Sequence, residues 1–176
     1  MKCLNQEIEG VKIIEHEPFI DNRGVFTRIY CEKQFEEFGI EKKISQMNLS
    51  FNKYEYTLRG FHYQEEPHGE DKTMKCIAGA IYDIVVDLRK DSNTYLQWIS
   101  FEFTEKDSVS LYVPKGCANA FLTLKPNTLM HYNSSNAYSP SNEKGIRYND
   151  PLFNFKWKSE PKVISEKDLN HLDYKI

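Results

Sequence analysis

The chain has 176 residues, and its 23 basic and 26 acidic side chains give a formal net charge of −3 at pH 7. This length fits one domain, residues 1–176, with a core large enough to fold without disulfides or metal. The small negative charge argues against a nucleic acid partner held by bulk charge, so any phosphate group has to meet a local cluster of basic residues.

The cysteine pattern and the absence of long apolar runs indicate where the protein works. Four scattered cysteines without a Cys-x-x-Cys pair suggest neither a zinc knuckle nor a disulfide framework, so we expect reduced thiols. The start, MKCLNQEIEG, lacks the apolar stretch of a secretion signal, and no run approaches the roughly 20 residues of a membrane span. We therefore expect a cytoplasmic protein with no membrane partner.

The predicted elements begin with a short amphipathic helix and continue as strands. The segment EKQFEEFG (32–39) spaces two phenylalanines three apart and ends at a glycine, which predicts a helix lying across a sheet. A short final helix is predicted over 165–172, where Ser165 precedes Asp168 by three residues. Between them lie runs rich in β-branched and aromatic residues, which predict a sandwich or barrel: 75–89, 97–104, 109–114, 118–124 and 128–135.

The segment LRGFHYQEEPHGEDK (58–72) raises the question of a metal, because histidines on barrel strands often hold one. His62 and His68 are six residues apart with Pro67 between them, and no His-x-His occurs in the chain. In the turn PKGCANAF, Asn119 stands where a metal-binding jelly roll of the cupin type supplies a histidine. A neutral amide is a poor transition-metal ligand. The sequence therefore offers no converging ligand set, and we expect no metal.

Seven stretches occur in the order of a known family: DNRGVF (21–26), QMNLS (46–50), LRGFHYQ (58–64), VDLRKDSNTYLQW (86–98), VPKGCANAFLTL (113–124), GIRYNDP (145–151) and ISEKD (164–168). Together they resemble the dTDP-4-dehydrorhamnose 3,5-epimerase family. The resemblance implies an all-β cupin jelly-roll barrel with a few short helices, no cofactor, and a homodimer with exchanged N-terminal strands. It also implies a nucleotide-sugar substrate, a 4-keto-6-deoxy sugar on a nucleoside diphosphate, used in deoxysugar and surface polysaccharide biosynthesis.

Epimerisation beside a C4 ketone needs a base, a group that poises the base, a cation for the enolate oxygen and an acid on the opposite face. His62 is the candidate base, because imidazole titrates near working pH and because it matches the family's catalytic histidine. The resemblance assigns the other three roles to Asp168, which pairs with the histidine, Lys72, which faces the enolate oxygen, and Tyr132, which is the acid.

Each of these residues also has a structural interpretation. His62 could be a strand histidine bonded to a neighbour, and Asp168 occupies a helix-capping position. Tyr132 alternates with Met130, which places both on one face of a strand, so it could be a core tyrosine. Lys72 could be a solvated charge.

Substrate binding is assigned to a second group of residues. Arg59 suits a diphosphate through its fork of donors, but strict alternation puts Arg59 and His62 on opposite faces unless a bulge or turn occurs at Gly60. The resemblance adds the pocket residues Gln46, Asn48 and Tyr138, of which the first two share a face, and Arg23 and Phe26, which reach the nucleotide from the neighbouring subunit.

Two positions depart from the family pattern. Arg28 replaces a glutamate that helps to hold the nucleotide, and Asn119 replaces a histidine. If Phe26 and Arg28 share one side of a strand, the guanidinium could donate to guanine O6 and N7, so we hypothesise a GDP-linked sugar. The alternative is that Arg28 turns to solvent or phosphate. Because Asn119 replaces a histidine, the sequence does not determine which side chain binds a polar group of the sugar or phosphate, or which carbons of the sugar react.

Other functions remain open at this point. A related cupin could isomerise the sugar through an enediol, moving the ketone between C3 and C4. A jelly roll that binds a sugar nucleotide without catalysis would need none of the acid and base set. The sequence also leaves open a hexose or a heptose, and reaction at C3, C5 or both.

Overall fold

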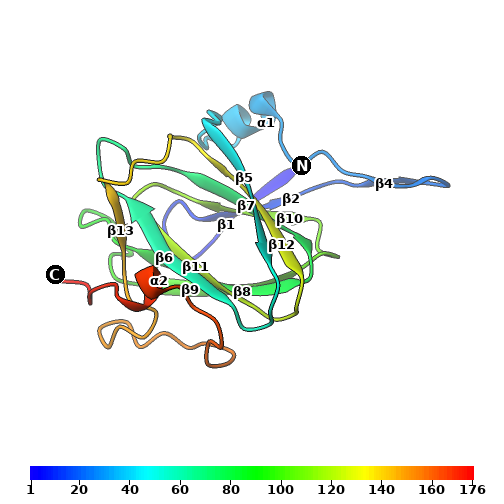
Figure 1. The fold of residues 1–176 in the computed structure, drawn as a ribbon. Coiled ribbons are helices and arrows are strands. Elements are labelled where there is room, and N and C mark those ends of the chain that lie inside the picture. Colours follow the sequence, from blue (N-terminus) through cyan, green and yellow to red (C-terminus); the bar gives the residue numbers. More distant parts are fainter.

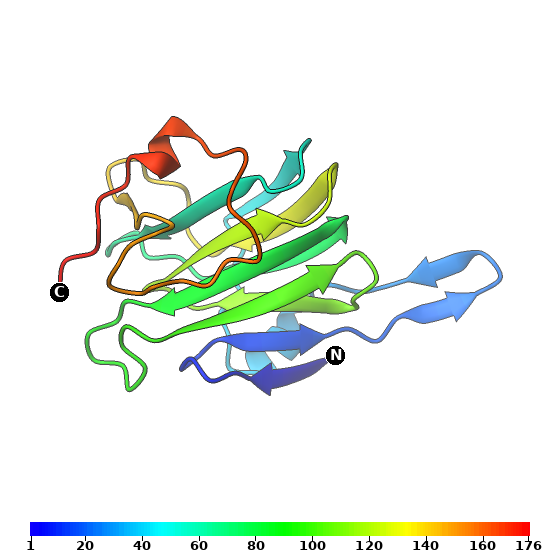
Figure 2. The same cartoon turned by 90° about the horizontal axis from the view of Figure 1, so that it is seen from below.

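The computed structural model describes residues 1–176 as two facing antiparallel sheets (Figures 1 and 2). The first sheet contains, in spatial order, β1 (Lys2–Asn5), β2 (Lys12–Glu15), β10 (Val109–Val113), β7 (Lys72–Ala78), β12 (Thr128–Ser134) and β5 (Gln46–Asn52). The second contains β13 (Glu143–Gly145), β6 (Leu58–Gln64), β11 (Cys117–Thr123), β8 (Ala80–Asp87) and β9 (Trp98–Thr104). The expected all-β sandwich is confirmed. The bounds of the N-terminal strands β1, β2 and β3 (Phe19–Asp21) were not predicted, and neither was the short strand β13.

The main core lies between the sheets, where Met74, Leu111 and Met130 of the first sheet pack with Val85 and Phe121 of the second. The outer face of the second sheet is covered as well, by apolar residues from the segment 146–157. β8 and β11 are consequently buried along their whole length. Burial on both faces explains why these strands read as continuous apolar runs rather than as alternating ones.

Both predicted helices are present. α1 (Glu32–Glu37) buries Phe35 against Ile14 and Tyr112 of the first sheet, as expected for a helix lying across a sheet. α2 (Glu166–Leu169) begins after Ser165, whose Oγ accepts a hydrogen bond from the Asp168 N–H at 3.0 Å. The cap leaves the Asp168 side chain free to turn toward β6. Neither helix is long or apolar enough to cross a membrane.

A bulge interrupts the pairing of β6 with β11. His62 pairs with Asn119 and Arg59 with Phe121, so three steps along β6 match two along β11. Gly60 has a φ of +113°, and a Cβ there would lie 2.5 Å from the Asn119 carbonyl oxygen. Only glycine meets both conditions. The irregularity expected at Gly60 is thus confirmed, and it brings Arg59 and His62 to the same cavity.

A two-stranded hairpin, β3 with β4 (Gly24–Phe26), projects from the body of the molecule (Figure 2). Its apolar side chains are exposed: Phe19, Ile20, Val25 and Phe26. β4 ends at Phe26, so Arg28 lies beyond the strand, and the expectation that the two share one side of a strand is wrong. β5, at the edge of the first sheet, likewise exposes Met47, Leu49 and Phe51.

The first prediction concerns Gly60. We expect Gly60→Ala to lower the free energy of unfolding by about 2 to 4 kcal/mol, because the added methyl group meets strand β11 and the backbone is left-handed. Gly24→Ala is the matched control, since Gly24 has a φ of +126° but nothing within 4 Å of its added Cβ. Urea denaturation of the two variants separates backbone strain from close approach. If both variants lose the same free energy of unfolding, the close approach of Gly60 to β11 does not contribute to the cost of its substitution.

Candidate active site

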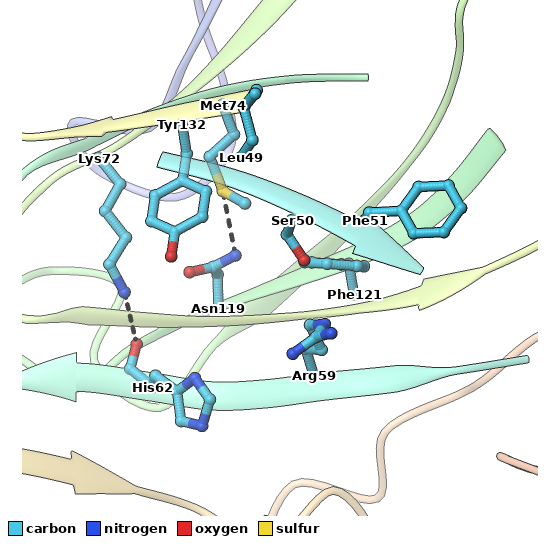
Figure 3. A pocket seen from close by; sticks show the side chains of 10 residues that line it. All are labelled: Leu49, Ser50, Phe51, Arg59, His62, Lys72, Met74, Asn119, Phe121 and Tyr132. Carbon is cyan, nitrogen blue, oxygen red and sulfur yellow. Dashed lines mark hydrogen bonds between the residues drawn. The ribbon is translucent and has the colours of Figure 1, made fainter. Parts of the chain in front are cut away.

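Two adjoining cavities open between the sheets and share His62, Lys72 and Tyr132. The larger measures 430 Å³ and is also lined by Leu49, Ser50, Phe51, Arg59, Met74, Asn119 and Phe121 (Figure 3). The second measures 380 Å³ and is also lined by Gln46, Asn48, Tyr63, Gln64, Glu70, Ser134, Tyr138 and Glu143. Eight of the predicted site residues, drawn from six separate stretches of sequence, therefore surround one region.

His62 and Asp168 form a close pair beside this region. His62 Nε2 lies 2.8 Å from Asp168 Oδ1, and Asp168 Oδ2 accepts the Gly60 N–H at 3.2 Å. Burial raises the pKa of Asp168, but the hydrogen bonds and the positive charge of His62 outweigh it, so this pKa lies below its ordinary value. The ionised carboxylate holds the proton of neutral His62 on Nε2, which leaves Nδ1 as the atom able to accept a proton.

Tyr132 and Lys72 approach the cavity from the opposite sheet, on β12 and β7 (Figure 3). Burial, followed by the charge of Glu70, raises the pKa of Tyr132, so its hydroxyl keeps its proton at neutral pH. The ammonium group of Lys72 donates to the His62 carbonyl oxygen at 3.1 Å and lies 3.4 Å from the carboxylate of Glu70. The expected shared face of Met130 and Tyr132 is confirmed.

Asn119 points into the larger cavity from β11, where its amide contacts two neighbours (Figure 3). Its Nδ2 donates to Met74 Sδ at 3.1 Å and to Asp83 Oδ2 at 3.3 Å. Asp83 is fully buried, and burial raises its pKa well above the ordinary value, which favours the neutral form of the carboxyl. Sequence reasoning missed Asp83, although an acid inside the apolar run IYDIVV is a visible signal.

Five of the predicted substrate-binding residues line the two cavities: Arg59, Asn119, Gln46, Asn48 and Tyr138. Arg59 lines the larger cavity and donates through Nε to Asn52 Oδ1 at 2.7 Å. In the second cavity, Gln46 Oε1 accepts the Tyr138 N–H at 2.6 Å, and the Tyr138 hydroxyl donates to Glu143 Oε2 at 2.6 Å. Glu143, which also pairs with Lys167, was not predicted.

Three predicted residues do not join the site. Arg23, Phe26 and Arg28 line neither cavity, because the hairpin carries the first two away from the sheets and Arg28 follows it. Arg23 instead pairs with Asp21 at 2.6 Å on the hairpin itself. Within one chain, these residues are therefore separated from the cavities.

A second histidine adjoins the His62–Asp168 pair. His171 Nε2 lies 3.7 Å from Asp168 Oδ1, and the rings of His171 and His62 meet edge to face with centroids 5.7 Å apart. Burial, followed by the charge of His62, lowers the pKa of His171, so it is neutral at pH 7. One donor atom from each of these three residues lies within 4.8 Å of the others, so the expectation of no converging ligand set is wrong. The spacing D-x-x-H on a helical turn was the signal available in the sequence.

Comparison with known proteins places this site in context. Residues 5–175 match the family model described as dTDP-4-dehydrorhamnose 3,5-epimerase. The enzyme of that name from Sinorhizobium fredii is 36% identical over 162 residues, covering 92% of this chain and 83% of the relative. A dTDP-4-dehydrorhamnose 3-epimerase from Streptomyces niveus is 35% identical over 169 residues, covering 94% of this chain and 80% of the relative.

The fold agrees with that match. The crystal structure of dTDP-4-dehydrorhamnose 3,5-epimerase from Bacillus anthracis, with TDP and PPi bound, superposes with a TM-score of 0.95 at 34% identity, covering 98% of this chain and 99% of that one. The expected cupin-type jelly roll and isomerase class are thereby confirmed. Because the sequence match and the superposition both extend over nearly the whole chain, this protein belongs to the dTDP-4-dehydrorhamnose 3,5-epimerase family.

Proposed function

We propose that this chain epimerises a nucleoside-diphosphate-linked 4-keto-6-deoxy sugar at C3 and C5 through an enolate. The observation that carries the proposal is the His62–Asp168 pair on one side of a cavity that has Tyr132 on the other. His62 stands on β6 of the second sheet and Tyr132 on β12 of the first. A proton can therefore leave one face of a sugar ring and return to the opposite face, which is what inversion requires.

In the first half of the reaction, His62 Nδ1 takes the proton from a carbon next to the ketone. The electron pair of the broken C–H bond moves onto the C4 oxygen, and the ionised Asp168 stabilises the imidazolium that forms. Lys72, whose ammonium group lies between the sheets, supplies positive charge for the enolate oxygen. Burial and the hydrogen bond to the His62 carbonyl oxygen hold that ammonium group in place.

In the second half, the Tyr132 hydroxyl gives its proton to the carbanion carbon from the far face. The raised pKa of Tyr132 keeps the hydroxyl protonated until this step. Solvent then returns a proton to the phenolate, and the imidazolium of His62 releases its proton to solvent. This acid distinguishes an epimerase from a 3,4-ketoisomerase, which moves a proton between neighbouring carbons on one face. A sugar-nucleotide binder without catalysis would not need the poised pair of His62 and Asp168.

The remaining pocket residues suit the rest of the substrate. Arg59 offers a guanidinium to the diphosphate, and the sugar meets Asn119 in the larger cavity. Gln46, Asn48 and Tyr138 extend the site into the second cavity. The names of the relatives carry dTDP, and Arg28 lies beyond the strand of Phe26, so we propose dTDP as the nucleotide and keep GDP as the alternative.

We further propose a homodimer in which the hairpin of one copy docks on the first sheet of the other. The hairpin and the edge strand β5 both expose apolar side chains, and neither has a cover within the chain. Docking the hairpin of one copy beside β5 of the other would bury both surfaces and bring Arg23, Phe26 and Arg28 to the partner's cavity. A nucleotide base could then stack on Phe26.

The second prediction tests the acid and the base by incubation of candidate 4-keto sugars in heavy water. His62→Asn should slow deuterium exchange at C3 by at least about 100-fold, because an amide cannot accept the proton. Tyr132→Phe should still allow exchange but slow formation of inverted product. Nuclear magnetic resonance reads deuterium and configuration at C3 and C5 separately.

His131→Asn is the control for this experiment, because His131 precedes Tyr132 on β12 but lines neither cavity. Normal exchange in His62→Asn would contradict the assignment of the base. Unchanged inversion in Tyr132→Phe would eliminate that residue as the acid, and parallel loss of exchange and inversion would point to a role in binding.

The third prediction concerns the nucleotide. Competitive binding should rank dTDP above GDP, CDP and UDP for the wild-type protein, and Arg28→Glu should leave this order unchanged. Arg23→Glu on the hairpin is the comparison, since it makes the same change of charge. Tightest binding of GDP, lost in Arg28→Glu alone, would instead support a purine held by Arg28.

The fourth prediction tests the exchanged hairpin by complementation. A His62→Asn chain has an intact hairpin, and a Phe26→Asp chain has an intact cavity, so each alone should be inactive. After the two are mixed unfolded and refolded together, half the dimers are mixed and each holds one complete site, which should restore about one quarter of wild-type activity. Absence of any recovery, in mixtures that sediment as dimers, would rule out a shared site.

A further inference from the structure

His171 presents a buried nitrogen that the reaction does not use. Its Nε2 is shielded from solvent and has no hydrogen-bond partner, which is uncommon for a buried polar atom. The nearest acceptor is Asp168 Oδ1 at 3.7 Å, too far for a hydrogen bond, and that oxygen is already paired with His62 at 2.8 Å. An explanation for His171 therefore has to include something that its nitrogen can bind.

The fold makes room for this side chain beside the base. Asp168 lies in the short helix α2 and His171 lies two residues beyond its end, and both side chains contact His62 of β6. Gly145 of β13 pairs in register with His62, and a Cβ at Gly145 would overlap the His171 ring. The ring thus occupies the space that any other residue at position 145 would fill.

The two separations from Asp168 Oδ1 are close to those between metal ligands, and all three donor atoms lie within 4.8 Å of one another. Zinc binds nitrogen and oxygen at about 2.0 to 2.2 Å, which places tetrahedral ligand atoms about 3.4 Å apart. The observed separations from Asp168 Oδ1 are 2.8 Å to His62 Nε2 and 3.7 Å to His171 Nε2, so both approach this value with shifts of a few tenths of an ångström. The Gly60 N–H holds the other oxygen of Asp168 and fixes the carboxylate.

We propose that His62, Asp168 and His171 form a binding site for a divalent transition-metal ion such as Zn²⁺, and that the ion inhibits the enzyme. Two imidazoles and one carboxylate are a zinc ligand set, in which a water molecule can take the fourth position. The two further charges beside the site, Glu143 and Lys167, pair with each other, so Asp168 supplies the net negative charge.

The chemistry of imidazole explains the inhibition. A metal bound to Nε2 of neutral His62 takes the lone pair of that nitrogen, and the ring proton moves from Nε2 to Nδ1. No proton is gained or lost, but Nδ1 no longer has a lone pair for the substrate proton. The ion also replaces the hydrogen bond that joins His62 to Asp168. Inhibition rests on the proposed function, whereas binding of the ion does not.

The fifth prediction is tested first by calorimetric titration of the full chain with Zn²⁺ alone. The wild type should bind one ion, and His171→Gln should bind it at least about 10-fold more weakly, because a ligand is lost. His68→Gln is the matched control, since it removes an exposed histidine outside the cluster. All variants keep the four free cysteines, so the difference between them reports on this site.

Turnover provides the second measurement. Without metal, His171→Gln should turn over substrate at the wild-type rate, and it should need at least about 10-fold more Zn²⁺ for half inhibition. Removal of the Zn²⁺ with EDTA should restore the turnover of both proteins. Gly145→Ala, which keeps all three ligands but displaces the His171 ring, should weaken binding as well, and it replaces His171→Gln if that variant misfolds.

Equal Zn²⁺ affinity in the wild type and His171→Gln, or no binding to the wild type, would overturn the site. Binding without inhibition would overturn the proposed mechanism of inhibition. If the wild type turns over none of the candidate sugars, the proposed function fails, while the calorimetric comparison still decides whether the metal site exists.

Discussion

The buried carboxylate of Asp168 is the constraint on which the rest of the site depends. A charge with only 4% of its residue exposed has to be paired and hydrogen bonded, and three elements meet this requirement together. His62 supplies the ion pair, the backbone of Gly60 supplies an N–H, and the cap at Ser165 turns the carboxylate inward. The same arrangement explains why β6 is irregular at Gly60, since a regular strand would carry Arg59 out of the cavity.

The two facing sheets of the sandwich carry different functional residues. Strands β8 and β11 of the second sheet are buried on both faces, so they form a rigid support for Asn119 and for the neighbouring strand that carries His62. The first sheet carries Lys72 and Tyr132 on its inner face. The proposed base therefore comes from one sheet and the proposed acid from the other. The hydrogen bond from Lys72 to the His62 carbonyl oxygen links the two sheets directly. A single sheet could not present groups to both faces of a sugar ring.

Residues within regular, strongly patterned strands could be predicted from the sequence, as Met130 and Tyr132 on one face of β12 show. The bulge at Gly60 could also be expected, because two functional side chains of opposite parity had to meet. Asp83 and His171 were missed for different reasons. Asp83 reads as part of an apolar run, and the rise of its pKa depends on burial by distant strands. His171 follows Asp168 by three residues, but it reaches His62 only through the tertiary packing of the C-terminal segment on β6, which that spacing alone does not reveal.

The position of Asp168 on a lightly anchored segment also has a consequence for how the enzyme fails under stress. α2 buries Asp168 alone and exposes Leu169, and the chain beyond it exposes Leu172, whereas β8 is buried throughout. Such a segment belongs to the regions that open locally at a lower free energy than the global transition. Mild heat or denaturant would therefore detach the carboxylate from His62 while the sandwich is still intact. Catalytic inactivation should precede the loss of β structure, and the amides near α2 should exchange with solvent long before those of β8.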